Sequence, residues 1–367
     1  MNEDIDIIQE RFYINIKGWN VYITLSKNII IEELTIPIIL IHGLASTHQS
    51  FNEVSDILQR NGCITASIDL RGHGNSNKEN DINNNSIDDE INDFTIAALV
   101  DDVADIISIL RCHPLYEQLD YNPWSKPVLL CGHSYGGTIA LEVATNYPSL
   151  VQGIICIDGG HINLKKSFPQ YEDCERELHP PDFEGLRWST LEKAVREQWC
   201  FDWPESGIMA MLNNFKKVEV QLDIDDYTTK FPKTNPNSPS KQSLELQLDI
   251  DLNETVTTSP KFKVEHVMPK LLKSRHLLLL KDLWNFNPIE RYPLCQCPVL
   301  LLPTGDGQRA PFTVNKSDDV KDATELLKIS NVIWFDNCSH DLPSQFPIET
   351  ANTILNAIKK EYFMWPK

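Results

Sequence analysis

Unbroken apolar runs of strand length recur along the chain and are separated by polar or helix-patterned segments. The runs occupy residues 37–42, 63–70, 127–131, 153–157, 298–302 and 331–335. A strand that is covered on both faces of a parallel sheet shows such a run, because no position along it faces water. Segments with the apolar spacing of helices lie among them, at 96–110, 137–146, 317–328 and 346–360. This alternation predicts an α/β fold with a doubly wound, mostly parallel sheet.

A different pattern opens the chain, where residues 11–25 alternate β-branched and aromatic residues with polar ones. Alternation of period two is typical of strands with one solvated face. Lys17 and Gly18 interrupt the alternation, and glycine is favoured in tight turns. We therefore predict a hairpin of two exposed strands that turns at Gly18.

The longest interval between predicted strands, 161–291, is too long to be a loop in a compact domain. We therefore predict that 161–291 form an inserted cap or lid. Residues 1–160 and 292–367 are then predicted to form the α/β core.

Patterns within the predicted cap differ from part to part. Residues 188–215 and 264–283 have a helical character, whereas 223–260 carry several prolines among Asn, Ser and Thr. A segment of that composition buries little apolar surface, which predicts a flexible stretch near 223–260. The acidic, Asn-rich segment 78–92 is predicted to be a mobile loop for the same reason.

Charge narrows the classes of partner. The chain has 367 residues with 33 Lys and Arg against 52 Asp and Glu, a formal net charge of −19. Such a field repels phosphate backbones and anionic lipid headgroups, so we expect no nucleic-acid partner. The sequence contains no apolar run long enough for a membrane-spanning helix, and its acidic start lacks the features of a signal peptide. We expect a cytoplasmic protein without a membrane span.

The nine cysteines are scattered, and their odd number argues against a framework of disulfides. Cys295 and Cys297 are the closest pair, but their spacing does not suit a zinc ribbon and no histidine pair lies nearby. We expect free, buried thiols in a reducing compartment. Residues 305–310 match the dinucleotide pattern G-x-G-x-x-A, yet Pro311 and Phe312 follow at once, near the end of the predicted sheet. We therefore expect neither a metal nor a cofactor.

A candidate nucleophile lies in the sequence Gly132-His-Ser-Tyr-Gly136, which matches G-x-S-x-G. The preceding strand, 128–131, and the following helix, 137–146, supply the context that this pattern requires. Glycines are needed on both sides of so sharp a turn, because a Cβ there would clash with neighbouring elements. The turn lifts the hydroxyl above the sheet at the positive end of the helix, which favours a nucleophilic role for Ser134.

These features resemble the α/β-hydrolase superfamily over residues 13–360, apart from the predicted cap. The resemblance rests on His42-Gly-Leu-Ala45, on Asp69-Leu-Arg-Gly-His-Gly-Asn-Ser76, on the elbow at 132–137, and on a late acid and histidine. It implies a ligand site at the carboxyl ends of the strands, where all these motifs fall. It also implies that the backbone N–H groups of Leu44 and Tyr135 form an oxyanion hole.

A serine hydroxyl needs a general base, and histidine has a suitable pKa near neutral pH. His340 follows the last predicted strand and precedes the last predicted helix. Members of the superfamily keep their catalytic histidine in that loop, and the chain order Ser, acid, His is satisfied. The resemblance therefore implies that His340 is the base, while His133, His42 and His73 have packing or structural roles.

The acid that orients His340 has more than one candidate. Asp306 follows the penultimate predicted strand, where the superfamily usually places this carboxylate. Asp158 ends the preceding strand and is the rival, because some members place the acid there. Asp341 is an outsider, since it adjoins the histidine that it would have to face. We favour Asp306 and keep Asp158 open.

The leading functional hypothesis is a cofactor-independent serine hydrolase that cleaves a carboxylic ester, lactone or related acyl bond of a small apolar or acyl-containing substrate. Serine at the elbow disfavours the epoxide hydrolase and haloalkane dehalogenase branches, whose nucleophile there is aspartate. A C–C bond hydrolase or thioesterase would use the same triad, and a hydrolase-fold receptor would bind a ligand without catalysis. Aromatic residues of the predicted cap either wall an apolar pocket or form its own core: Trp188, Trp199, Phe201, Trp203, Phe215, Trp284 and Phe286. The sequence makes no prediction about oligomeric state.

Overall fold

The computed structural model describes residues 8–27, 36–78, 93–116, 122–183, 186–222, 262–305 and 316–363. The chain divides into two compact units. Unit 1 consists of Met1–Pro180, Asp202–Asn214 and Lys270–Lys367, and unit 2 of Pro181–Phe201 and Phe215–Pro269. Residues 79–92 of the predicted mobile loop and the predicted flexible stretch 223–260 lie outside the described residues.

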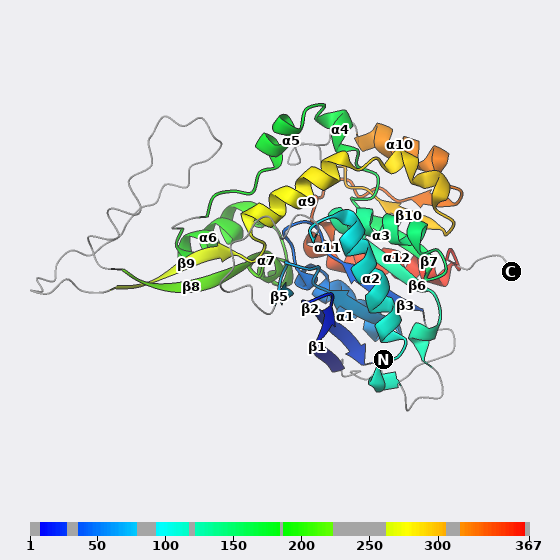
Figure 1. Cartoon of the computed structure of the whole chain (residues 1–367), viewed down its shortest axis with the longest axis horizontal. Coiled ribbons are helices and arrows are strands. Elements are labelled where there is room, and N and C mark those ends of the chain that lie inside the picture. Colours follow the sequence, from blue (N-terminus) through cyan, green and yellow to red (C-terminus); the bar gives the residue numbers. More distant parts are fainter. Residues whose placement is uncertain are drawn as a thin grey trace, which may run out of the picture. The chain divides into compact units, whose positions relative to one another are not determined.

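A nine-stranded sheet runs through unit 1 in the order β1-β2-β4-β3-β6-β7-β10-β11, with the short β5 paired to β2 (Figure 1). Its strands are β1 (Ile8–Ile16), β2 (Trp19–Lys27), β3 (Pro37–Ile41), β4 (Ile64–Ile68), β5 (Asn77–Lys78), β6 (Val128–His133), β7 (Val151–Ile157), β10 (Val299–Leu302) and β11 (Ser330–Val332). The neighbours from β4 to β11 pair in parallel, whereas β1, β2 and β5 make antiparallel pairs. The prediction of a mostly parallel sheet is therefore confirmed.

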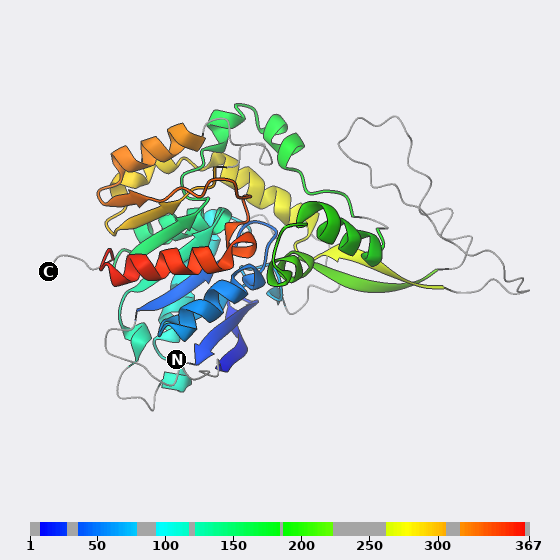
Figure 2. The same ribbon diagram turned by 180° about the vertical axis from the view of Figure 1, so that it is seen from behind.

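Helices cover both faces of this sheet. The helices of unit 1 include α1 (Asn52–Arg60), α2 (Ile96–Leu110), α3 (Tyr135–Asn146), α4 (Leu164–Ser167), α5 (Tyr171–Leu178), α7 (Glu205–Leu212), α9 (Lys273–Asn285), α10 (Lys316–Leu326), α11 (Leu342–Gln345) and α12 (Pro347–Lys359). Helices α2 and α3 lie over one face (Figure 1), and α1 and the red α12 lie over the other (Figure 2). Ile39 and Ile41 of β3 pack with residues of α2 and α3, whereas Ile38 and Leu40 pack with residues of α1 and α12. No position of a strand buried on both sides in this way faces water.

The predicted hairpin at the start of the sheet is present, and its turn lies at Lys17 and Gly18. Their φ angles of 51° and 86° are the left-handed values that two-residue hairpin loops require. The expectation that both strands are exposed is wrong for β2, where Trp19, Ile23 and Leu25 are buried. The reason is that β2 also pairs with β4 and so lies inside the sheet.

Unit 2 contains α6, a π-helical turn and an antiparallel pair of strands. Their bounds are α6 (Trp188–Ala194), the turn Val195–Trp199, β8 (Phe215–Leu222) and β9 (Phe262–Pro269). The helix predicted over 264–283 is wrong in its first part, because residues up to Pro269 belong to β9 and α9 begins at Lys273. Alternating Phe262-Lys-Val-Glu suits a strand, and Pro269 has no N–H with which to continue a helix.

The predicted cap, 161–291, contains all of unit 2. Helices α4, α5, α7 and α9 also fall within that range but belong to unit 1. Across the described ranges, none of the helices is long and apolar enough to cross a membrane.

Candidate active site

The loops that follow neighbouring parallel strands bring the predicted chemistry to one edge of the sheet. Gly43 follows β3, Ser134 follows β6 and Asp158 follows β7, and these three strands are adjacent. Carboxyl ends of parallel strands meet at the same edge, which is where open α/β sheets bind ligands. His340 reaches this edge from the loop between β11 and α11.

Ser134 occupies a sharp turn between β6 and α3, as predicted. Its φ and ψ of 53° and −117° are rare for a residue with a Cβ and are the strain expected of a nucleophile elbow. The turn is enclosed by backbone: a Cβ on Gly132 would lie 2.1 Å from the Gly136 carbonyl oxygen, and one on Gly136 would lie 2.2 Å from the Ile41 oxygen. Glycine at these two positions is what allows the strand, turn and helix to pack together.

His340 lies between the serine and a carboxylate. Its Nε2 is 2.8 Å from the Ser134 hydroxyl oxygen, and its Nδ1 is 2.7 Å from Oδ2 of Asp158. Because a carboxylate accepts, Nδ1 carries the proton and Nε2 is left free to accept the serine O–H. The order serine, histidine, carboxylate and these distances have the geometry that a Ser-His-Asp triad requires.

His133, which precedes Ser134, supports the loop that carries His340. Its Nε2–H donates to the backbone oxygen of His340 at 2.8 Å. Burial, together with the neighbouring His340 charge, lowers the pKa of His133 to about 4, so its ring is neutral. The supporting role predicted for this residue agrees with that geometry.

Asp158 is fully buried and is surrounded by donors. Besides His340, its carboxylate accepts the Thr304 N–H at 3.0 Å, the Thr304 hydroxyl at 2.8 Å and the Lys316 ammonium at 2.8 and 2.9 Å. Burial alone would raise the pKa of Asp158, but the bond to His340 and the charges of His340 and Lys316 hold it well below the usual range. The carboxylate is therefore ionised.

Asp306, the acid favoured from the sequence, lies outside the described residues. In the structure, the N–H at Nδ1 of His340 is bonded to the rival, Asp158. The signal for Asp158 was the sequence Asp158-Gly159-Gly160 directly after a buried strand. A Cβ on Gly159 would lie 2.0 Å from the Ser134 carbonyl oxygen, so glycine after the acid is what lets the β7 loop pack against the elbow.

The segment predicted to form the oxyanion hole lies close to the nucleophile. A Cβ on Gly43 would be 3.2 Å from the Ser134 Cβ, so the loop after β3 approaches the serine directly. Within the described ranges, neither the Leu44 N–H nor the Tyr135 N–H donates to a protein acceptor. Backbone amides beside the serine are the donors that an oxyanion hole requires.

Two of the remaining histidines have the structural roles predicted for them. His42 accepts the Leu70 N–H at Nε2 and donates from Nδ1 to the Gly43 oxygen at 2.7 Å, which fixes the loop after β3. His73 bonds the Arg71 oxygen through Nδ1, and burial together with the charge of His42 lowers its pKa to about 3. Both rings are buried and neither is placed as a general base.

The pKa of His340 is raised above its ordinary value of 6.5. Partial burial alone would lower it, but the hydrogen bond and charge of Asp158 outweigh that effect, with a further contribution from Asp341. The protonated form of His340 is thus stabilised by its neighbours.

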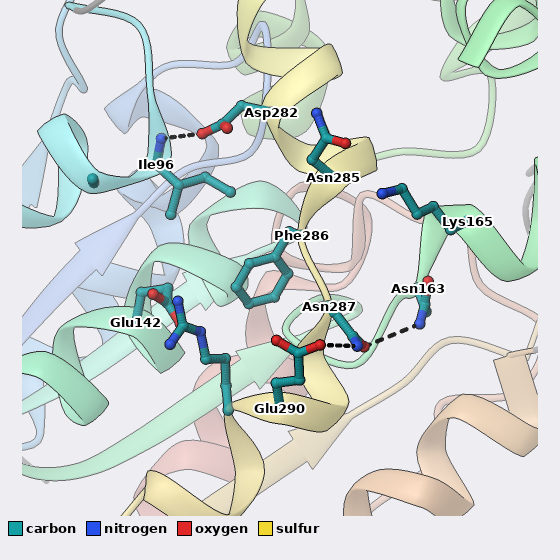
Figure 3. Close-up of a pocket in the computed structure, with 11 residues that line it drawn as sticks. Ile96, Glu142, Asn163, Lys165, Asp282, Asn285, Phe286, Asn287 and Glu290 are labelled. Atoms are coloured by element: carbon teal, nitrogen blue, oxygen red, sulfur yellow. Dashed lines mark hydrogen bonds and ion pairs between the residues drawn. The ribbon is translucent and has the colours of Figure 1, made fainter. Parts of the chain in front are cut away.

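A cavity of about 530 Å³ opens elsewhere in unit 1, among α2, α3 and α9 (Figure 3). Figure 3 shows Phe286 between Glu142 and Asn163, so this one of the cap aromatics lines a cavity. The residues around it are Ile96, Ala97, Glu142, Asn163, Lys165, Asp282, Asn285, Phe286, Asn287, Glu290 and Arg291. Since Ser134, His340 and Asp158 are not among them, this cavity is separate from the Ser134 site. Phe215, by contrast, packs edge-on against Phe183 within unit 2.

All nine cysteines are free thiols, as predicted, and each is buried except Cys112. Cys295 and Cys297 have their sulfur atoms 3.8 Å apart. Across the described part of the chain, no group of three or more His, Cys, Asp or Glu side chains is placed to hold a metal ion.

Comparison with known proteins supports the assignment of the fold. Residues 36–203 match the family described as alpha/beta hydrolase fold. Protein phosphatase methylesterase 1 of Neurospora crassa is 23% identical over 196 residues, which are 49% of this chain and 41% of that protein. The sn-1-specific diacylglycerol lipase ABHD11 of Xenopus tropicalis is 27% identical over 180 residues, which are 48% of each chain. The chain therefore spans less than half the length of either relative.

A similar solved structure is that of E-2-(acetamidomethylene)succinate hydrolase. It superposes with a TM-score of 0.59 at 15% identity, over 96% of this chain and 99% of that one. At such identity the likeness concerns the fold alone, and it confirms the fold class that the sequence predicted.

Proposed function

The chain belongs to the α/β-hydrolase superfamily, and from that premise we propose that it is a serine hydrolase which cleaves a carboxylic ester, lactone or related acyl bond. The observation that carries the proposal is the continuous line of hydrogen bonds from the Ser134 hydroxyl through His340 to Asp158. Ser134 is the nucleophile, His340 the general base and Asp158 the acid that orients it.

In the first half of the reaction, His340 Nε2 takes the Ser134 proton as the oxygen attacks the substrate carbonyl. The imidazolium that forms is stabilised by the ionised Asp158 at its other nitrogen. The negative charge that develops on the carbonyl oxygen is bound by the Leu44 and Tyr135 N–H groups. His340 then gives its proton to the leaving group, and an acyl-enzyme remains.

The second half repeats these steps with water. His340 removes a proton from the water molecule that attacks the acyl carbon, the same two amides bind the oxyanion, and Ser134 leaves as its proton is returned. Every group needed for this cycle belongs to the chain itself, and no redox step occurs.

The names of two relatives favour an ester as the substrate of this chain. The names of the Neurospora methylesterase and the Xenopus lipase both denote enzymes that hydrolyse carboxylic esters, and both align with about half of this chain. We therefore place esters ahead of thioesters and C–C bonds as substrates.

The direct test is labelling with a fluorophosphonate probe, which reacts with activated serines. We expect the probe to modify the peptide that contains Ser134, as identified by mass spectrometry. A panel of p-nitrophenyl esters of increasing acyl length, thioesters, lactones and β-diketones then ranks the substrates. A folded protein whose Ser134 resists the probe is a ligand-binding protein, and that result would overturn the proposal.

The activity should increase with pH across an acidic limb, because only neutral His340 can accept the serine proton. Since the pKa of His340 is raised, this limb should be centred above 6.5, with the protonated, inactive form persisting to higher pH than for a free histidine. The measurement is the rate of Ser134 labelling between roughly pH 5 and 9. A limb centred below 6.5 would contradict the assignment of His340 as a base held by an ionised aspartate.

Gly43→Ala should reduce kcat by about 10- to 100-fold, because the new Cβ would press on Ser134 and His133 and displace the Leu44 N–H. The matched control is Gly62→Ala, whose Cβ meets no atom within 4 Å. It strains only its own backbone, so it should lower the melting temperature without changing kcat. Equal kcat for wild type and Gly43→Ala would argue against an oxyanion hole at Leu44.

A further inference from the structure

Lys316, the first residue of α10, is a lysine whose side chain is only 6% exposed. Its Nζ donates to both Asp158 oxygens at 2.8 and 2.9 Å and to the backbone and hydroxyl oxygens of Thr304, each at 3.0 Å. A buried ammonium is tolerated only when its donors and its charge are matched in this way. The proposed acid therefore has a cationic partner, Lys316, on one side and the imidazole of His340, which becomes cationic during the proposed reaction, on the other.

Lys316 and Thr304 together fix the Asp158 carboxylate. Oδ1 accepts the Thr304 N–H and the Lys316 ammonium, while Oδ2 accepts the Thr304 hydroxyl, the same ammonium and His340 Nδ1. Rotation of the carboxylate would break several of these bonds at once. The position of His340 relative to Ser134 thus depends on residues that themselves never reach the serine.

The ammonium also changes the charge that His340 experiences. Asp158 alone would present a full negative charge to the imidazolium, whereas the pair of Asp158 and Lys316 is formally neutral. A cation beside the acid therefore favours release of the imidazolium proton, and Lys316 acts in this direction on the pKa of His340.

We propose that Lys316 is a positioning residue of the catalytic site, which locks the Asp158 carboxylate toward His340 and partly neutralises it so that the base is free at lower pH. This inference rests on the proposed triad and deepens it. A lysine that merely tied α10 to the sheet would contribute to the stability of the fold. Its replacement would leave unchanged the pH dependence of the rate at which Ser134 reacts.

Other titratable groups face these side chains from the elements packed around them. Among the residues that the structure describes, they are His133 on β6, His161 after β7, Asp319 on α10 and Asp341 beside His340. His161 donates from Nδ1 to the Gly159 oxygen, and burial lowers its pKa, so it is neutral. Asp319 bonds the Asn163 N–H and the Lys166 ammonium. None of these groups is itself substituted in the variants below.

The test measures the rate of fluorophosphonate labelling of Ser134 against pH in wild type and Lys316→Met. This readout needs no knowledge of the substrate. We expect the acidic limb of the variant to move up by about one pH unit, because the full charge of Asp158 then acts on His340. The rate at the plateau should fall about tenfold, since the carboxylate has lost a partner that held it. Lys316→Gln, which retains a donor without the charge, should show the same shift and keeps the test open if methionine prevents folding.

Lys166→Met is the matched control. Lys166 is a 33% exposed lysine that also bonds a carboxylate on α10, namely Asp319, but it does not touch Asp158. The acidic limb of the labelling profile of Lys166→Met should coincide with that of wild type. A limb that stays in place or moves down in a folded Lys316 variant overturns the inference, and so does loss of labelling at every pH. Failure of wild-type Ser134 to react would instead refute the proposed function, so the two failures are distinguishable.

Discussion

Replacing Ser134 with alanine should lower kcat for an activated ester by about 10⁴- to 10⁶-fold. The hydroxyl is the only group lost. Because alanine has the same Cβ as serine, the backbone strain at φ 53° is neither relieved nor increased. Turnover of p-nitrophenyl acetate measures the effect, and the melting temperature shows that the fold survives.

Ser125→Ala is the control for that experiment, because its hydroxyl bonds only a nearby backbone oxygen on an exposed turn. It should retain wild-type turnover. Near wild-type kcat in Ser134→Ala would mean that another group carries the reaction.

Asp158→Asn should lower kcat by about 10⁴-fold, the cost measured where a triad aspartate was changed in this way. Asparagine keeps the shape but loses the charge that faces the imidazolium and favours the wrong tautomer of His340. It also leaves the Lys316 ammonium buried without a counter-ion, a situation that costs about 3 to 5 kcal/mol when one partner of a buried pair is removed. The variant should therefore melt at a lower temperature than wild type.

The double variant Asp158→Asn/Lys316→Met separates these two effects. It removes both charges, so it should recover much of the lost stability while kcat stays low. Asp306→Asn provides the comparison that decides the acid, and we expect it to lose no more than about tenfold in kcat. A larger loss for Asp306→Asn than for Asp158→Asn would return the acid role to the residue that the sequence favoured.

Much of the fold could be predicted because its signals are local. Strands buried on both faces have unbroken apolar runs, and the Gly132-to-Gly136 motif requires its strand, turn and helix. The segment 264–283 shows where local pattern fails: pairing with β8 made its first part a strand. The prediction that β2 is exposed was wrong because β2 also pairs with β4. The alternation of apolar and polar residues within one strand does not show which other strands it pairs with.

The sequence identifies those residues of the candidate site that belong to a recognisable motif. Ser134 and His340 are identified by the elbow and by the loop before the last helix, and the structure brings the two together. The two candidate acids follow β7 and β10, which are adjacent strands with Ile157 opposite Leu302. Both loops therefore leave the sheet at the same place, and sequence alone does not separate them.

Lys316 could not be predicted because a lysine at the start of an amphipathic helix normally faces water. Its burial depends on a carboxylate that is distant in the sequence and close in space. Such a pair has no local signature.

The bond from His133 to the backbone oxygen of His340 has a consequence for the order of events in the proposed mechanism. Once the serine oxygen is esterified, it has no proton left to donate to His340, and the base loses one of its two side-chain partners. The His133 bond is made to the peptide and not to the imidazole, so acylation of Ser134 does not remove either of the groups that form it. The backbone of His340 is thus held in position between the two proposed chemical steps. Its imidazole is therefore in place to accept a proton when the water molecule attacks.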